Sequence, residues 1–308
     1  MSRSRLSRRW LPAAAGLGLG LAALLESSAG AQSSWSLVPL EGVRRTGTFG
    51  EPPLVENSGV IPSRTQPGIL WSVADSDGPP RIYATDTLGE DRGSLRLRGA
   101  RNVDWEAISA GSCGAGHCLY VADTGDNREQ RQSVQLYRIR EPRVESLGGE
   151  HGTSSRVERL EVRYPDGPHD VEAAFVDGRG DVHLISKGRT SGVRHYRVPA
   201  AAWRSPAVVA QPLGVLPIEE SRGLGSLVTD AAVSPSGGLV AVRTYGEIFL
   251  FHLTGRGTLR PAWVGCGLGG LELQGEGVAW LDDSTLVLTS EGFLGFPGTI
   301  TLGRCPSS

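Results

Sequence analysis

An acidic residue stands at the start of five apolar runs along the 308-residue chain. In each case one or two small residues separate the acid from a run rich in Val, Ile, Ala or Phe. Carboxylate oxygens that converge on one point bind hard cations, and a bound cation can activate water for hydrolysis. The sequence therefore offers five candidate metal ligands, which are Glu56, Glu106, Glu172, Asp230 and Glu276.

The segments after each acid also repeat, and they predict the elements that must position it. One β-type run follows a turn, as at Leu119–Val121, and a second follows a polar loop, as at Val134–Tyr137. Short strands joined by Gly-rich turns and repeating at about 40–50 residues are typical of antiparallel propeller blades. In four of the five units a further run precedes the next acid, namely Leu95–Leu97, Val157–Leu160, Val208–Ala210 and Pro261–Val264.

The fifth unit ends after three strands, and an N-terminal segment can supply the missing one. Its last run is Thr299–Leu302, whereas two further runs, Trp35–Leu40 and Val43–Thr46, precede the first acid. A strand from the N-terminus would close the ring and remove its open edges. We therefore predict an all-β fold, a five-bladed β-propeller closed by an N-terminal strand. Six blades are the alternative, because residues 141–168 and 201–227 are long enough to contain further strands.

Propeller geometry places the five acids around one mouth of the central channel. Within a blade, the start of the innermost strand and the loop between strands two and three lie on the same face. These positions add a binding face of Asp75, Asp104, Asp126, Asn127, Asp170, Tyr245 and Glu291.

Carboxylates this close cannot all remain ionised and unpaired, because like charges repel one another. Calcium is the expected cofactor, since it takes six to eight oxygen ligands in flexible geometry. The alternative is that the acids accept backbone N–H bonds from the neighbouring blade and only hold the ring together.

Three further residues beside the acids are candidates for catalysis. Lys187, the single lysine of the chain, and Arg243 could stabilise a developing oxyanion next to a metal ion. His169 could act as a base or as a ligand. The alternatives are salt bridges with the acids for the two cations, and a role in capping a turn for the histidine.

Residues 1–31 have the features of an export signal, and residues 32–308 are expected to form a single domain. A basic start precedes an apolar stretch, Leu11–Leu25, and a small-x-small cleavage site at Ala29–Ala31. Ser7–Leu11 fits a twin-arginine motif as well as a Sec signal, so both routes stay open. The apolar stretch is shorter than the roughly 20 residues of a membrane span, which predicts no stable membrane anchor.

The four cysteines predict two disulfides, because their number is even and the chain carries an export signal. Cys113 and Cys118 flank a turn and could staple a hairpin. Cys266 and Cys305 would then tie the last blade to its neighbour. Zinc is the competing interpretation, but one C-x4-C pair without a second Cys or His pair has poor ligand spacing.

Composition excludes several partners. A net charge of −2 leaves no basic surplus with which to neutralise phosphates, so nucleic acid is not an expected partner. Gly265–Gly270 satisfies G-x-G-x-x-G, but no βαβ unit surrounds it, so no nucleotide cofactor is expected. The expected partner is a small molecule or another protein.

Short phrases recur in a fixed order along the chain, among them Glu56-x-Ser58-Gly59 and Asp166-Gly167-Pro168-His169-Asp170-x-Glu172-Ala173. This ordered set resembles that of a group of exported bacterial β-propeller proteins that are loosely described as WD40-like. The resemblance covers nearly the whole mature chain and implies a propeller and export, without an assigned reaction. One departure is Ala74-Asp75, where the resemblance leads us to expect Asn-Asp. The phrases include Asn102-Val103-Asp104-Trp105-Glu106, Gly125-Asp126-Asn127, Arg243-Thr244-Tyr245 and Gln274-Gly275-Glu276.

The layout is also loosely similar to that of five-bladed, calcium-dependent nucleotidases of the apyrase type, in which acids surround a central calcium. Two functional hypotheses follow. The first is an exported binding or scaffold module whose acid-lined channel mouth holds a structural cation. The second is a calcium-dependent hydrolase acting on phosphoesters or lactones, and the sequence does not decide whether the protein is an enzyme.

Overall fold

The computed structural model describes residues 34–49, 54, 56–76, 78–147, 152, 154, 157–218, 225–272 and 274–306, which belong to one compact unit, Ser34–Ser308. The expected export signal, residues 1–31, lies outside the described residues. Within the described part of the chain, no helix combines the length and the apolar character needed to cross a membrane.

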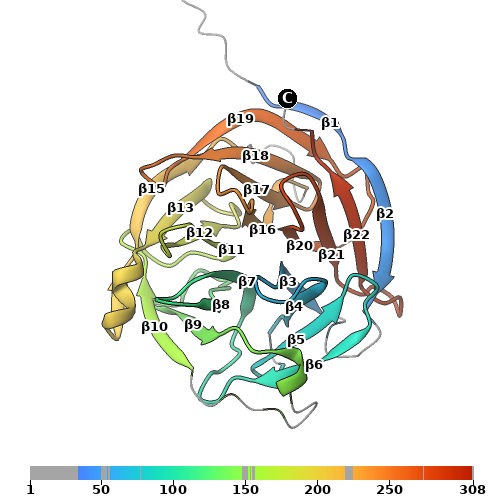
Figure 1. Ribbon diagram of the computed structural model, residues 1–308. Helices are drawn as coiled ribbons and strands as arrows, with labels where there is room; N and C mark the ends of the chain where they lie inside the picture. The colour runs from blue at the N-terminus through green and yellow to red at the C-terminus, as the bar shows by residue number, and fades with distance from the viewer. Residues whose placement is uncertain are drawn as a thin grey trace, which may run out of the picture. The chain divides into compact units, whose positions relative to one another are not determined.

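Five sheets follow one another around a central axis and form a five-bladed β-propeller (Figure 1). Blade 1 contains β3 (Asn57–Pro62), β4 (Ile69–Ala74), β5 (Arg81–Asp86) and β6 (Asp91–Arg96). Blade 2 contains β7 (Trp105–Ser112), β8 (His117–Asp123), β9 (Val134–Arg140) and β10 (Glu158–Arg163). Blade 3 contains β11 (Val171–Val176), β12 (Val182–Ser186), β13 (Val193–Val198) and β15 (Gln211–Leu216).

The last two blades complete the ring. Blade 4 contains β16 (Val228–Val233), β17 (Leu239–Thr244), β18 (Glu247–Leu253) and β19 (Leu259–Gly267). Blade 5 contains β20 (Gly275–Trp280), β21 (Leu286–Ser290), β22 (Thr299–Arg304) and, from the N-terminal part of the chain, β2 (Glu41–Thr48). Two short 3-10 helices, η2 (Val144–Ser146) and η4 (Ala200–Arg204), lie in connections.

The innermost strands are buried on both faces, because each packs against the innermost strands of the neighbouring blades. β11 illustrates this, since all of its residues, VEAAFV, are buried. Large apolar side chains such as Trp71, Trp105 and Phe175 fill the space between blades and are fully excluded from solvent. The strands that carry the acids are therefore held rigidly.

The N-terminal strand closes the ring as predicted. β2 pairs antiparallel with β22, from Glu41 opposite Arg304 to Thr48 opposite Thr299. The two N-terminal runs divide between two blades, because the first of them, β1 (Ser36–Pro39), pairs in parallel with β19 of blade 4.

One predicted strand belongs to a different blade. Val208–Ala210 was expected to be the fourth strand of blade 3, but β14 (Ala207–Val209) pairs in parallel with β10 of blade 2. The chain reaches blade 2 through η4, where Trp203 packs against Tyr120 and under the guanidinium of Arg138. It then returns to blade 3 as β15, so the long segment before β16 contains no sixth blade among the described residues.

Both predicted disulfides are present. Cys113–Cys118 links the two strands of the β7–β8 hairpin. Cys266–Cys305 joins β19 of blade 4 to the residue that follows β22 of blade 5. Two disulfides and no free cysteine match the chemistry of an oxidising compartment.

Candidate metal centre at the channel mouth

Three glutamates occupy equivalent positions at bulges in the innermost strands of three blades. In β7 the register with β8 shifts between Trp105 and Ala107, which leaves Glu106 outside the regular ladder. Corresponding shifts leave out Glu172 in β11 and Glu276 in β20. A bulge re-aims the extra side chain, and here it turns three carboxylates toward the same end of the channel.

Blades 1 and 4 carry hydroxyl side chains at the bulge position. Ser58 takes it in β3 and Thr229 takes it in β16. The Thr229 hydroxyl donates a 2.9 Å hydrogen bond to the backbone oxygen of Glu276, so it links two blades. The bulges therefore present three carboxylates, whereas the sequence repeat suggested five.

The structure places the other two predicted ligands elsewhere. Glu56 is exposed and lies two residues before its bulge, at the position that Asp104 and Asp170 occupy in their blades. Asp230 follows its bulge and accepts hydrogen bonds from the backbone N–H groups of Ala231 and Val278, at 2.8 and 2.9 Å. Asp230 thus holds blade 5 against blade 4, which is the structural role considered as the alternative.

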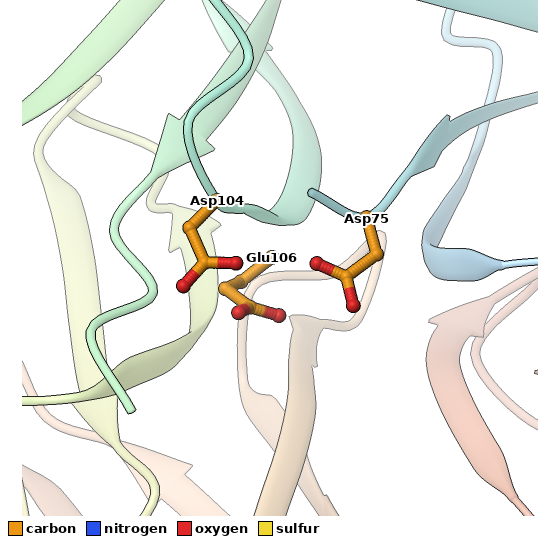
Figure 2. A group of neighbouring side chains, drawn as sticks. All are labelled: Asp75, Asp104 and Glu106. Carbon is orange, nitrogen blue, oxygen red and sulfur yellow. The ribbon is translucent and has the colours of Figure 1, made fainter. Parts of the chain in front are cut away.

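A first cluster of carboxylates joins blades 1 and 2. Asp75 directly follows β4, Asp104 directly precedes β7, and Glu106 lies in the β7 bulge. One oxygen of each lies within 4.8 Å of the others. Figure 2 shows these carboxylates gathered from the two blades around a common point.

A second cluster shares Glu106 with the first. Glu106, Asp170 and Glu172 also bring one oxygen each within 4.8 Å of the others. Asp170 Oδ1 accepts the backbone N–H of Asp126 at 2.8 Å, whereas Asp170 Oδ2 has no hydrogen-bond partner in the described part of the chain although the residue is only 2% exposed. A buried carboxylate oxygen without a partner is costly, and a cation would supply the missing contact.

Lys187 neutralises part of the negative charge of these two clusters. Its Nζ donates a 2.7 Å hydrogen bond to Glu172 Oε1, and both side chains are buried. Burial alone would lower the pKa of Lys187, but the adjacent Glu172 carboxylate raises it. On the next blade the Tyr245 hydroxyl hydrogen-bonds Glu276. The carboxylates at the channel mouth are therefore accompanied by one ammonium group, that of Lys187, and one phenol, that of Tyr245.

Burial and mutual repulsion raise the pKa values of the acids at the channel mouth. Burial, followed by the charge of Glu172, raises the pKa of Glu106. Burial and then the neighbouring Asp75 raise the pKa of Asp104 to about 7. Burial is also the main cause that raises the pKa of Glu172 and Glu276 to about 8 and that of Glu291 to about 7. Without a bound cation the site thus retains protons that a cation would displace.

Gly125 makes room for the first cluster. A Cβ atom at this position would overlap Glu106 Oε1 and Asp104 Cγ, so a larger residue fits only if these two carboxylates move. The same loop is held by Arg131, whose guanidinium donates to Gly125 O at 2.7 Å and to Asp123 Oδ1 at 3.0 Å. Asn127, another predicted residue of this face, is exposed at the loop surface.

Two amides support the acids and were not among the predicted site residues. Asn102 Nδ2 donates to the backbone oxygens of Asp75 and Ala74, at 2.7 and 3.2 Å. Gln274 Nε2 donates to Glu291 Oε2 at 3.0 Å. Both amides stand two positions before an acidic residue, and that spacing is the sequence signal that could have identified them.

The remaining catalytic candidates are engaged in structural contacts. Arg243 is fully buried, donates to the backbone oxygens of Gly277 and Thr289 at 2.7 and 3.0 Å, and pairs with Glu272.

His169 packs against the rings of Tyr164 and Tyr196, which also contact each other, and its Nε2 lies 3.2 Å from Asp166 Oδ1. Of the three catalytic candidates, only Lys187 contacts a carboxylate of the two clusters.

The pKa shifts predict how the stability of the calcium-free protein changes with pH. An acid whose folded-state pKa is raised stabilises the fold below its unfolded pKa of about 4.5, and this stabilisation is lost as pH rises through the folded pKa. We therefore expect the melting temperature in EDTA to fall as pH rises from 6.5 to 9. Burial is the main cause that lowers the pKa of His195 to about 3. Protonation of this histidine therefore affects stability only at pH values below 6.5.

Calcium-saturated protein provides the control for this pH series. A bound cation replaces the protons of its own ligands, Asp104 and Glu106 among them, so the melting temperature should fall less over the same range. Equal slopes with and without calcium would contradict the assignment of the raised pKa values to the metal centre. Differential scanning calorimetry in both buffers measures the difference.

A second prediction concerns the close packing at Gly125. Gly125→Ala should push Asp104 and Glu106 apart, with a loss of about 1–3 kcal/mol of stability from overpacking and at least tenfold weaker calcium binding. Gly178→Ala is the control, because a Cβ at Gly178 would meet nothing within 4 Å. Urea denaturation and calcium titration test both variants, and normal calcium affinity in Gly125→Ala would refute the packing argument.

No protein-family model and no curated protein matches this chain. Among solved structures, the chain is similar to the PQQ-bound aldose sugar dehydrogenase of Streptomyces coelicolor, at 10% identity and a TM-score of 0.46, over 86% of this chain and 98% of that one. It is also similar to the gluconolactonase XC5397 of Xanthomonas campestris, at 12% identity and a TM-score of 0.44, over 81% and 72%.

A third similar structure is virginiamycin B lyase of Staphylococcus aureus, at 14% identity and a TM-score of 0.41, over 83% of this chain and 69% of that one. At these identities and scores the similarities transfer no activity.

Proposed function

We propose that this chain is an exported β-propeller that binds one calcium ion at the channel mouth. Asp75, Asp104 and Glu106 would be the ligands of the ion, and Asp170 would contribute its free oxygen. The observation that carries the proposal is Asp170 Oδ2, a buried carboxylate oxygen without a partner among the described residues, which belongs to the second cluster and is linked to the first through the shared Glu106. Such an oxygen is compatible with the fold when a cation completes its coordination.

The donor set favours calcium. All four side chains offer only oxygen, which suits a hard cation, and none of the four is a Cys or a His. Lys187 already pairs with Glu172. The negative charge available to an ion therefore comes from the four proposed ligands. Magnesium requires near-octahedral geometry and keeps several waters, whereas calcium accepts an irregular set of carboxylates.

Removal and return of the metal test this proposal. Protein stripped with EDTA should bind one calcium ion per chain in isothermal titration calorimetry. Its melting temperature should rise with calcium concentration, by the equivalent of about 2.7 kcal/mol at a concentration 100 times the dissociation constant.

Matched variants sharpen this test. Asp75→Asn should weaken calcium binding, whereas Glu90→Gln, an exposed acid outside the two clusters, should not. Absence of binding heat, together with an unchanged melting temperature in calcium, would refute the proposal.

A second candidate function is calcium-dependent hydrolysis of phosphoesters or lactones. One observation favours it: the ammonium of Lys187 and the hydroxyl of Tyr245 lie beside acids of the ring and could stabilise developing negative charge. A screen of both substrate classes with wild type and Tyr245→Phe tests it. Turnover that requires calcium and is lost in Tyr245→Phe supports an enzyme, and no turnover on either class supports a binding module.

Export is the remaining part of the proposal. The two disulfides are consistent with an oxidising compartment, and residues 1–31 carry the expected signal features. Expression of the full chain in a bacterial host should yield a mature protein that starts after Ala31. N-terminal sequencing of the periplasmic and extracellular fractions measures this, and an intact N-terminus in the cytoplasm would contradict it.

A further inference from the structure

A hairpin tip on the mouth face exposes three large apolar side chains. It lies in the β21–β22 loop, Glu291–Gly298, where Phe293 and Phe296 exchange two backbone hydrogen bonds of 3.0 and 2.9 Å. The exposed fractions are 43% for Phe293, 82% for Leu294 and 74% for Phe296. We call residues 293–296 the apolar tip.

The conformation of the apolar tip is unfavourable for its sequence. Leu294 has a φ of 50° and Gly295 has a φ of 83°, so both turn residues are in the left-handed region. Turns of this kind favour Asn or Gly first, and a leucine there costs roughly 1–2 kcal/mol. Leu294 also contributes nothing to the core. Strained residues of this kind cluster at functional sites, and solvent contact gives no reason for a leucine at this position.

The same face carries a further exposed apolar side chain and three exposed arginines. The loops between strands two and three and the connections between blades all lie at this end of the ring. Val103, in the connection before β7, is 52% exposed. Three exposed arginines, Arg101, Arg128 and Arg189, lie on these loops, and among the described residues no acidic side chain pairs with them.

The carboxylates of this face differ in exposure. Glu106 and Glu172 are buried, whereas Asp75, Asp104 and Glu291 are half-buried. Glu56 and Asp166 are exposed, and Asp166 pairs with Arg194. Glu129 is tied by a 2.5 Å hydrogen bond from the Thr190 hydroxyl, which links the loops that carry two of the arginines. In the described part of the chain, the outer surface of this face therefore combines the exposed apolar side chains and three unpaired arginines with two exposed acids, one of which is already paired.

We infer that the mouth face docks peripherally on an anionic lipid surface. The apolar tip would enter the boundary between head groups and acyl chains, where Phe and Leu side chains of peripheral proteins bind. The arginines would contact head-group phosphates, each strengthening binding about fivefold. Peripheral binding requires two such signals together, because one apolar insertion alone is weak and reversible. Charge complementarity is the reason to choose an anionic lipid over an apolar protein groove.

This inference does not depend on the proposed calcium site. Calcium would strengthen docking by neutralising the carboxylates that face the same lipid surface. Experiments in EDTA therefore test the tip and the arginines alone, and experiments in calcium test the added contribution of the ion. If the protein docks in EDTA and calcium adds nothing, the calcium proposal fails and the docking inference stands.

Vesicle sedimentation tests the inference with the mature protein. Vesicles of phosphatidylcholine alone and of phosphatidylcholine mixed with phosphatidylglycerol are compared. Wild type should bind the mixed vesicles, and the double variant Leu294→Ser, Phe296→Ser should bind at least tenfold more weakly. Because both side chains are exposed, thermal melting should show the variant as stable as wild type.

Two further variants complete the design. Leu88→Ser is the control, since Leu88 is 59% exposed in the β5–β6 turn at the opposite end of the ring, and it should bind like wild type. Arg128→Ala should weaken binding about fivefold, and only on the anionic vesicles. Absence of binding to both kinds of vesicle, or equal binding by the tip variant and wild type, would overturn the inference.

Discussion

Replacing Glu106 by glutamine is expected to abolish calcium binding while leaving the calcium-free protein at least as stable as wild type. Glu106 is shared by both carboxylate clusters. Loss of an outer-shell partner alone costs about 10–100-fold in metal affinity, so loss of a direct ligand should cost more than about 100-fold. Stability should not fall, because burial and the neighbouring carboxylates raise the pKa of Glu106 and an uncharged amide removes this repulsion.

Glu276→Gln is the matched control for this experiment. Glu276 occupies the same bulge position in blade 5 but belongs to neither cluster. This variant should also stabilise the calcium-free protein, yet it should retain most of its calcium affinity. Calorimetric titration and thermal melting of both variants separate the two effects. Equal calcium affinities in Glu106→Gln and wild type would show that the clusters are not the binding site.

Replacing Arg243 by leucine is expected to cause the largest loss of stability, about 3–5 kcal/mol. The Arg243 guanidinium is fully buried and pairs with buried Glu272. It also satisfies two backbone oxygens of blade 5. Its removal leaves an uncompensated carboxylate and two unpaired acceptors between blades 4 and 5. Urea denaturation at pH 7 measures the loss.

Comparison with an exposed ion pair and with a double variant tests the cause. Arg92→Leu breaks the pair with Asp86, in which the Arg92 side chain is 43% exposed, and should cost far less than Arg243→Leu because solvent screens the exposed pair. Arg243→Leu combined with Glu272→Leu should recover part of the loss, because it removes the stranded charge. A cost below 1 kcal/mol for Arg243→Leu alone would contradict the assigned role.

The ring and its closure could be predicted from the sequence because they depend on patterns that tolerate small errors. Strand position follows from runs of apolar residues, and an error of two residues leaves the blade intact. Closure by an N-terminal strand followed from counting strands, since a fifth unit without its fourth strand would leave an open edge. β14 was misassigned because its partner is chosen by Trp203 in the preceding turn, a tertiary contact without periodicity.

The candidate site tolerates no such error. Glu106 and Glu172 lie in bulges, whereas Glu56 precedes its bulge by two residues and Asp230 follows its bulge by one. The sequence repeat treated these acids as equivalent, but a shift of one residue in a strand reverses the direction of the side chain. Register therefore separates a candidate ligand from a residue that binds two backbone N–H groups.

The same reasoning applies to the two cations. Lys187 and Arg243 were equal candidates because both follow or end the second strand of a blade. Lys187 lies one position beyond its strand and reaches Glu172, whereas Arg243 is within β17 and turns into the interface between blades. Their shared positive charge could not distinguish the two residues in the sequence. Their different contacts follow from where each lies relative to the end of its strand.

The pairing of β2 with β22 determines the order in which the molecule can be completed. Each blade's inner hairpins form from neighbouring segments, so they can fold while later residues are still being synthesised. The ring, however, stays open until residues 299–304 are free to meet residues 41–48. Until then two strand edges remain unpaired, and such edges recruit other chains. The interval between synthesis of β20 and release of β22 is thus when this protein is most exposed to aggregation, and when assistance from a chaperone would matter most.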